Sequence, residues 1–87
     1  MAGFRIQIKT SAAKELETAG TKADCRRIVE PLRALADDPR PKGVERLAGY
    51  ADRHRIRQGD YRIIYLVDDA RREVTILKIG HRKKVYR

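Results

Sequence analysis

The chain has 87 residues and a net charge of +9, from 21 Lys and Arg against 12 Asp and Glu, so we expect one domain over residues 1–87 with an anionic partner. A single cysteine excludes an internal disulfide, and no His/Cys/Asp/Glu cluster has metal-ligand spacing, so neither a metal nor another cofactor is expected. The chain lacks an apolar run of membrane-spanning length and a signal-peptide core, which predicts a soluble, cytoplasmic protein without a membrane partner.

The chain opens with a predicted strand and a short helix. Residues 4–8 alternate between apolar and polar side chains, which is the period of a half-buried strand. Thr10 and Ser11 follow at once and can cap a helix, and Gly20 is its predicted end.

A second, amphipathic helix is predicted after Thr21, which offers an N-cap. Its apolar residues recur at helical spacing: Cys25, Ile28, Val29, Leu32, Leu35 and Ala36. Cys25 belongs to this stripe, so we interpret it as a small core residue and not as a reactive thiol. Pro31 removes one backbone donor and is expected to kink or interrupt the helix.

The second half of the chain predicts a loop and four strands. Turn residues mark residues 37–43 as the loop. Strands are predicted over residues 44–47, 53–58, 61–68 and 73–79. The order β-α-α-β-β-β-β predicts an α+β fold, in which a hairpin of two N-terminal helices packs on one antiparallel sheet of four to five strands.

The two-residue loop Gly59-Asp60 predicts a tight hairpin and fixes its register. Arg57 then faces Arg62 directly, and directly opposed residues share one face of the sheet. Arg55 lies beside this pair. The other face carries isoleucines and suits packing under the helices.

Two directly opposed arginines indicate an anion site. Like charges in this position destabilise a sheet by up to about 1 kcal/mol, so an anion between them would restore the balance. The planar guanidinium is well suited to phosphate. The alternative is that both side chains extend into water or reach Asp52 or Asp60.

The positive charge is concentrated in two segments. Residues 40–62 hold seven bases and three acids, and residues 81–87 hold four bases and no acid, whereas residues 63–80 are balanced. If the fold joins the two segments, they form one surface for a phosphate chain. The alternative is a solvated basic face that only aids solubility.

A tyrosine and two histidines are further candidates for a role at these basic segments. Tyr86 can stack on a base or move a proton, and His81, next to Arg82, can donate or accept a proton. His54 falls on the face of Ile56, so a core or rim position is favoured over catalysis.

Two sequence blocks, residues 55–65 and residues 80–87, give a resemblance that extends over nearly the whole chain, including Asp38-Pro39-Arg40-Pro41. The chain resembles the RelE/ParE superfamily of bacterial and archaeal toxins, on the RelE side. This resemblance implies a metal-independent endoribonuclease that enters the ribosomal A site and cuts messenger RNA there. It also implies a cognate antitoxin as partner.

The resemblance also implies which residues act. The family's functional residues match Arg55, Arg57, Arg62, Arg82 and Tyr86. We expect the substrate's own 2′-hydroxyl to attack the scissile phosphate, with Arg57 and Arg62 stabilising its charge. Arg82 would neutralise the leaving oxygen, and Tyr86 would act as the base or stack on a splayed base.

Four residues of the two basic segments are also expected to bind substrate: Arg55, His81, Lys83 and Lys84.

The chain also departs from the family pattern. Some relatives have lysine in place of Arg55 and Arg57, and because guanidinium exchanges protons poorly, a charge-stabilising role is favoured here. Relatives often have a basic residue inside the Leu-x-Gly turn, where this chain has Ala48. ParE-type members tend to lack the C-terminal tyrosine and arginine, which favours a ribonuclease. The alternatives are a ParE-type inhibitor of DNA gyrase without nuclease activity and a non-catalytic RNA-binding module.

Overall fold

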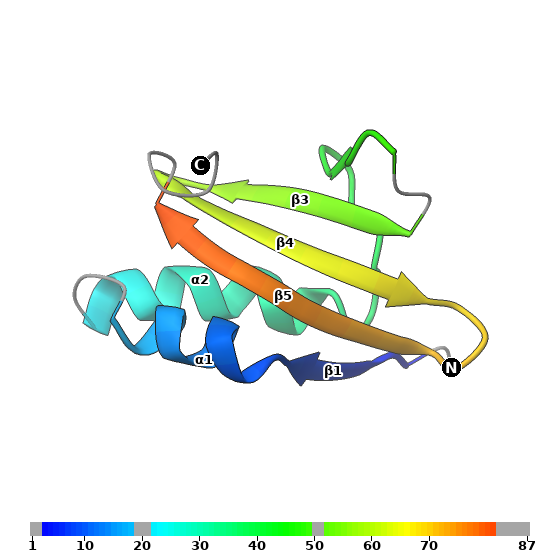
Figure 1. The fold of residues 1–87 in the computed structure, drawn as a ribbon, viewed down its shortest axis with the longest axis horizontal. Helices are drawn as coiled ribbons and strands as arrows, with labels where there is room; N and C mark the ends of the chain where they lie inside the picture. The colour runs from blue at the N-terminus through cyan, green and yellow to red at the C-terminus, as the bar shows by residue number, and fades with distance from the viewer. Residues whose placement is uncertain (1–2, 19–21, 50–51, 82–87) are drawn as a thin grey trace.

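The computed structural model describes residues 3–18, 22–49 and 52–81, which form two helices and a five-stranded sheet (Figure 1). The elements are β1 (Arg5–Ile8), α1 (Thr10–Glu17), α2 (Lys22–Ala34), β2 (Glu45–Arg46), β3 (Arg53–Gln58), β4 (Tyr61–Asp68) and β5 (Glu73–His81). Their order confirms the predicted α+β fold with two N-terminal helices. None of the described helices is long and apolar enough to cross a membrane.

The sheet is mixed, so the prediction of a wholly antiparallel sheet was wrong. Its strand order is β1-β5-β4-β3-β2, and β2 to β5 pair antiparallel. The first strand pairs parallel with the last, with Arg5 opposite Glu73 and Ile8 opposite Ile76. No hairpin joins these two strands, and a parallel pair needs a long connection such as the one that both helices provide.

Both helices cover the same face of the sheet, and the core lies between them and β4 and β5 (Figure 1). The largest fully buried side chains are Tyr65, Ile28, Leu35, Ile63, Ile76, Ile79 and Val74. Full burial of one such aliphatic side chain stabilises a fold by about 1.5–3 kcal/mol. Within the predicted helical stripe, Ile28, Leu32 and Leu35 are buried, whereas Cys25, Val29 and Ala36 are half-buried. Cys25 donates its Sγ–H to the Leu16 carbonyl at 3.3 Å.

Two details of the helices differ from expectation. The N-cap of α1 is Lys9, without a side-chain hydrogen bond, so Thr10 is already helical and caps nothing. The Lys9 N–H still bonds to the Ile76 carbonyl, which carries the strand pairing up to the first helical turn. Pro31 lies within a continuous α2 and does not interrupt it. The predicted end at Gly20 and cap at Thr21 lie outside the described residues.

The β3–β4 hairpin has the predicted register. Arg57 is opposite Arg62 and Ile56 is opposite Ile63, with Gly59 and Asp60 as the loop. Gly59 has a φ of 59°, the left-handed value that the first loop position of a type II′ turn requires. The turn therefore explains why two arginines oppose each other on one face.

Candidate active site

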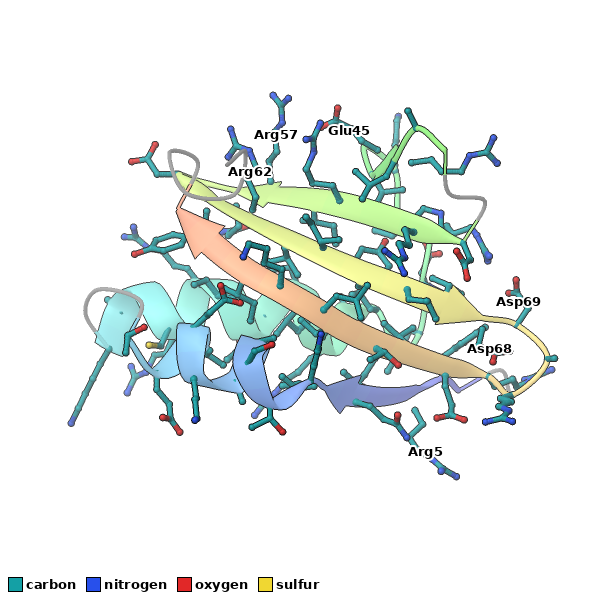
Figure 2. The ribbon with its side chains drawn as sticks, viewed as in Figure 1. Arg5, Glu45, Arg57, Arg62, Asp68 and Asp69 are labelled. Atoms are coloured by element: carbon teal, nitrogen blue, oxygen red, sulfur yellow. The ribbon has the colours of Figure 1, made fainter. Side chains whose placement is uncertain are left out.

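Three arginines lie on the face of the sheet that the helices leave open. Successive side chains of a strand point to opposite faces, so the burial of Ile63 and Tyr65 under the helices places Arg62 on the open face. Arg57, directly opposite, shares that face, and Arg55 lies two residues before it. In Figure 2, Arg57 and Arg62 extend from the same end of the sheet, away from the helices.

A carboxylate that sequence reasoning missed lies among these arginines. Glu45 on β2 is opposite Arg55 on β3. Its Oε2 is 3.1 Å from Nη2 of Arg55, and its Oε1 is 3.0 Å from Nε of Arg57. Arg57 therefore does have an acidic partner, but it is Glu45 and not Asp52 or Asp60, the two acids that the alternative interpretation named.

The charges in this cluster do not balance. The hydrogen bond from Arg55, helped by the charge of Arg57, lowers the pKa of Glu45, so this carboxyl is ionised at neutral pH. One carboxylate thus faces three guanidinium groups when Arg62 is included. The remaining positive charge makes this end of the open face suited to a phosphate.

Arg62 is held by the hairpin and not by an acid. Its Nη1 donates to the carbonyls of Tyr61 at 3.2 Å and Gly59 at 3.4 Å. Its Nε is buried and has no hydrogen-bond partner among the described residues. A buried donor without a partner is costly, by about 1–3 kcal/mol, so a bound anion at Arg62 would find donors already in place.

The end of β5 brings the second basic segment to the same place. Gly80 is opposite Arg62 and His81 is opposite Tyr61. Gly80 has no side chain, so β5 places no side chain beside Arg62 at this position. The side chain of His81, and all of Arg82, Lys83, Lys84 and Tyr86, lie outside the described residues. The register therefore supports the expected meeting of the two segments as far as His81.

A cavity lies on the open face next to the arginines. Its volume is about 520 Å³, and Ile64, which pairs with Arg55, forms part of its lining. The other lining residues are Lys9, Ser11, Glu15, Leu47, Arg53, Leu77 and Lys78. Its mixture of apolar and cationic side chains suits a ligand with flat apolar parts and anionic groups.

His54 does not belong to this site. It is 3% exposed and stacks on Tyr65 in the face that the helices cover, with ring centroids 5.5 Å apart, which confirms the predicted core position. Burial, together with the charge of Arg40, lowers its pKa, so His54 is neutral near pH 7.

No group of three or more His, Cys, Asp or Glu side chains with the geometry of a metal site occurs in the described ranges 3–18, 22–49 and 52–81. The chemistry that these ranges offer comes from guanidinium groups and the Glu45 carboxylate.

Comparison with known proteins agrees with this architecture. The family described as the ParE toxin of the type II toxin–antitoxin system, parDE, matches residues 6–86. The chain belongs to the RelE/ParE superfamily of toxins. Among curated proteins, Toxin RelE of Mycobacterium tuberculosis is 27% identical over 84 residues, covering 97% of this chain and 87% of the relative.

Solved structures give the same result. RelE in the RelE–RelB complex of the archaeon Pyrococcus horikoshii is 34% identical, with a TM-score of 0.82 over 97% of this chain and 99% of that one. A mutant of the E. coli toxin RelE in the free state is 27% identical, with a TM-score of 0.78 over 99% of this chain and 92% of that one. The similarity in structure therefore extends over nearly the whole chain.

Proposed function

We propose that this RelE/ParE-superfamily toxin is an endoribonuclease that cuts messenger RNA in the ribosomal A site and so inhibits translation. The observation that supports this most is that the Glu45 carboxylate pairs with both Arg55 and Arg57, with Arg62 directly opposite Arg57. Binding alone would need only cations, whereas a carboxylate in their midst adds a group that can accept a proton. The similarity to proteins named RelE supports the same activity.

The proposed reaction uses the substrate's own 2′-hydroxyl. Glu45, ionised at neutral pH, accepts the proton of this hydroxyl as its oxygen attacks the phosphorus. Arg57 and Arg62 stabilise the extra negative charge that develops on the phosphorane oxygens. The P–O bond to the 5′ oxygen of the next nucleotide then breaks and this oxygen takes up a proton from water, which leaves a 2′,3′-cyclic phosphate and a 5′-hydroxyl, while Glu45 returns its proton to the solvent.

The C-terminal segment completes the proposal. Arg82 neutralises the leaving 5′ oxygen, and Tyr86 stacks on a splayed base or shares the role of proton acceptor with Glu45. The flanking phosphates are bound by Arg55, His81, Lys83 and Lys84.

The ribosome supplies what this site lacks. A carboxyl whose pKa is lowered by two arginines is a weak base, so the protein alone would be slow. A ribosome that holds the message with the 2′-oxygen in line with the scissile bond lowers the barrier by orientation. This target also places the toxin in the cytoplasm.

A cognate antitoxin is the proposed partner that silences the toxin. The similar structure from P. horikoshii is a RelE–RelB complex, and another, from M. tuberculosis, is the toxin–antitoxin complex RelBE2. We propose that an antitoxin segment folds across this chain and either places carboxylates between Arg57 and Arg62 or displaces residues 81–87. Inhibition by charge would weaken steeply with salt, whereas displacement would depend mainly on apolar burial, which titration calorimetry at two salt concentrations would distinguish.

Inhibition of DNA gyrase is the second candidate, because the matching family is described as ParE. In that case the arginine cluster would bind its target without cleaving RNA.

Primer extension on messenger RNA with and without ribosomes, together with a gyrase supercoiling assay, tests the choice. Cuts within ribosome-bound codons, with naked RNA and gyrase unaffected, are expected. Intact message with inhibited gyrase would contradict the nuclease proposal and support the ParE activity, and binding without either effect would leave an RNA-binding module.

A further inference from the structure

The last part of β5 is the strand segment that faces Arg62, and no strand from the described ranges 3–18, 22–49 and 52–81 pairs with its outer edge. The parallel pairing with β1 ends where Ile8 meets Ile76. Pairing with β4 continues on the other side as far as His81. The segment from residue 77 to residue 81 is therefore held by one neighbouring strand only, although it carries the chain into the C-terminal basic segment.

A bulge lies at the start of this segment. Ile64 pairs with Lys78 and Tyr65 pairs with Ile76, so Leu77 is an extra residue without a partner in β4. A bulge bends a strand and disturbs its ladder. Beyond the bulge, residues 78–81 pair again with β4 and Ile79 is buried in the core, so the backbone groups that need another partner are those on the outer edge.

Glu15 on α1 provides such a partner. Its Oε1 accepts the backbone N–H of Ile79 at 3.2 Å, and its Oε2 is 3.4 Å from Nζ of Lys78. The carboxylate therefore takes the place of a missing strand at the residue directly before Gly80, which is opposite Arg62. Its side chain is 32% exposed, so part of this bond is shielded from water.

We propose that Glu15 is a positioning residue for the active site, which fastens the end of β5 against β4 so that Gly80 and His81 stay aligned with Arg62 and Tyr61. Glu15 lines the cavity on the open face, but its bonds are to Lys78 and Ile79 and not to the arginine cluster, and the role proposed for it needs no contact with RNA. It acts through the backbone of Ile79. The proposal rests on the nuclease function proposed above, but its structural part can be measured without RNA.

Two substitutions separate the roles of the two oxygens. Glu15→Ala removes both contacts. Glu15→Gln keeps an amide oxygen that can accept the Ile79 N–H, but loses the ion pair with Lys78. Glu17→Ala is the matched control, because Glu17 is an exposed carboxylate at the end of the same helix.

The first measurement is amide hydrogen exchange of the full chain, monitored by NMR. Exchange of the Ile79 amide is expected to become at least about 10-fold faster in Glu15→Ala, while Glu15→Gln and Glu17→Ala stay close to the wild type. The amides of core residues such as Val74 should be unchanged, which shows that the fold is intact. Unchanged exchange at Ile79 in Glu15→Ala would overturn the proposal, whatever the rate of RNA cleavage.

The second measurement is single-turnover cleavage on programmed ribosomes at saturating toxin. Glu15→Ala is expected to cut roughly 10- to 100-fold more slowly with unchanged ribosome affinity, the scale of a small misplacement, and Glu15→Gln should recover most of the rate. Equal loss in both variants would show that charge and not alignment matters, and would overturn the proposal. A wild type that does not cut at all would instead refute the nuclease function, and the exchange data would still decide the role of Glu15.

Discussion

Arginine and a carboxylate form ion pairs near each end of the sheet, but the paired charges cancel at only one of these two places. Near the β4–β5 turn, Arg40 makes two bonds to Asp69, at 2.7 and 3.0 Å, and the two charges cancel. At the other end, Glu45 is shared by Arg55 and Arg57. Figure 2 shows Asp69 far from Arg57 and Arg62. A balanced pair fastens loops, whereas excess charge held in a fixed geometry is suited to bind something else.

The surroundings of the balanced end agree with a structural role. Tyr65 donates its hydroxyl to the Pro39 carbonyl at 2.7 Å, next to Arg40, and its ring stacks on buried His54. These contacts tie the loop over residues 37–43 to β3 and β4. We therefore expect substitutions here to change stability, and substitutions at the arginine cluster to change activity.

The largest effect is expected for Arg62→Ala. Removal of one preorganised donor to a developing oxyanion typically costs about 10²–10³ in rate, so cleavage on ribosomes should fall by that factor and growth arrest should be lost. The unfolding midpoint in urea should change little. Arg5→Ala, at the opposite end of the molecule in Figure 2, is the control and should remain toxic. If both variants behave alike, the unbalanced end is not the site.

Glu45→Gln is expected to have the next largest effect. The amide cannot accept the 2′-hydroxyl proton, so the single-turnover rate should fall by about 10²-fold or more. At the same time affinity for RNA should rise, because a negative charge is removed from among cations. A variant that binds more tightly and still cuts at the wild-type rate would show that Glu45 only orients Arg55 and Arg57 and that the base lies elsewhere.

At the balanced end, His54 predicts a dependence of stability on pH. Its pKa is lowered in the fold, chiefly by burial and next by the charges of Arg40 and Arg46, whereas in the unfolded chain it is about 6.5. The unfolded state therefore binds more protons below that value, and stability is lost as the pH falls through it. His54→Phe keeps a ring against Tyr65, so its urea midpoint should fall less between about pH 7.5 and about pH 5.5. Equal losses in both proteins would refute this assignment.

The smallest effect is expected for Asp69→Asn. Both partners of this ion pair are well exposed, at 43% and 63%, and exposed pairs contribute little to stability. A small fall in the urea midpoint with unchanged cleavage is expected. A loss of cleavage comparable to that of Arg62→Ala would remove the distinction between the two ends.

The local sequence of the β3–β4 hairpin was enough to predict one half of the site. The two-residue loop Gly59-Asp60 allows only one favourable register between its flanking strands. The sequence of the hairpin therefore predicts that Arg57 lies opposite Arg62. Glu45 could not be placed in this way, because β2 has two residues and the connection to β3, residues 47–52, is too long for its length to fix the register. A predicted strand directly before the hairpin was the available signal, since a neighbour of β3 can place an acid beside its arginines.

Long-range features of the fold were also beyond the sequence. The parallel pairing of β1 with β5 joins residues at the two ends of the chain, and neither strand contains a signal for its partner. The bulge at Leu77 is not marked in the sequence by a glycine or proline at that position. Both features set the direction in which β5 enters the site, so the contact between Glu15 and Ile79 could be found only in three dimensions.

The chemistry of the cut ends tests the central claim most directly. Messenger RNA recovered from programmed ribosomes after exposure to the toxin should carry a 2′,3′-cyclic phosphate on one fragment and a 5′-hydroxyl on the other, as mass spectrometry can show. This result would follow from attack by the substrate's own 2′-hydroxyl at a site of arginines and one carboxylate. Fragments with a 5′-phosphate, or uncut message beside inhibited gyrase, would contradict the account.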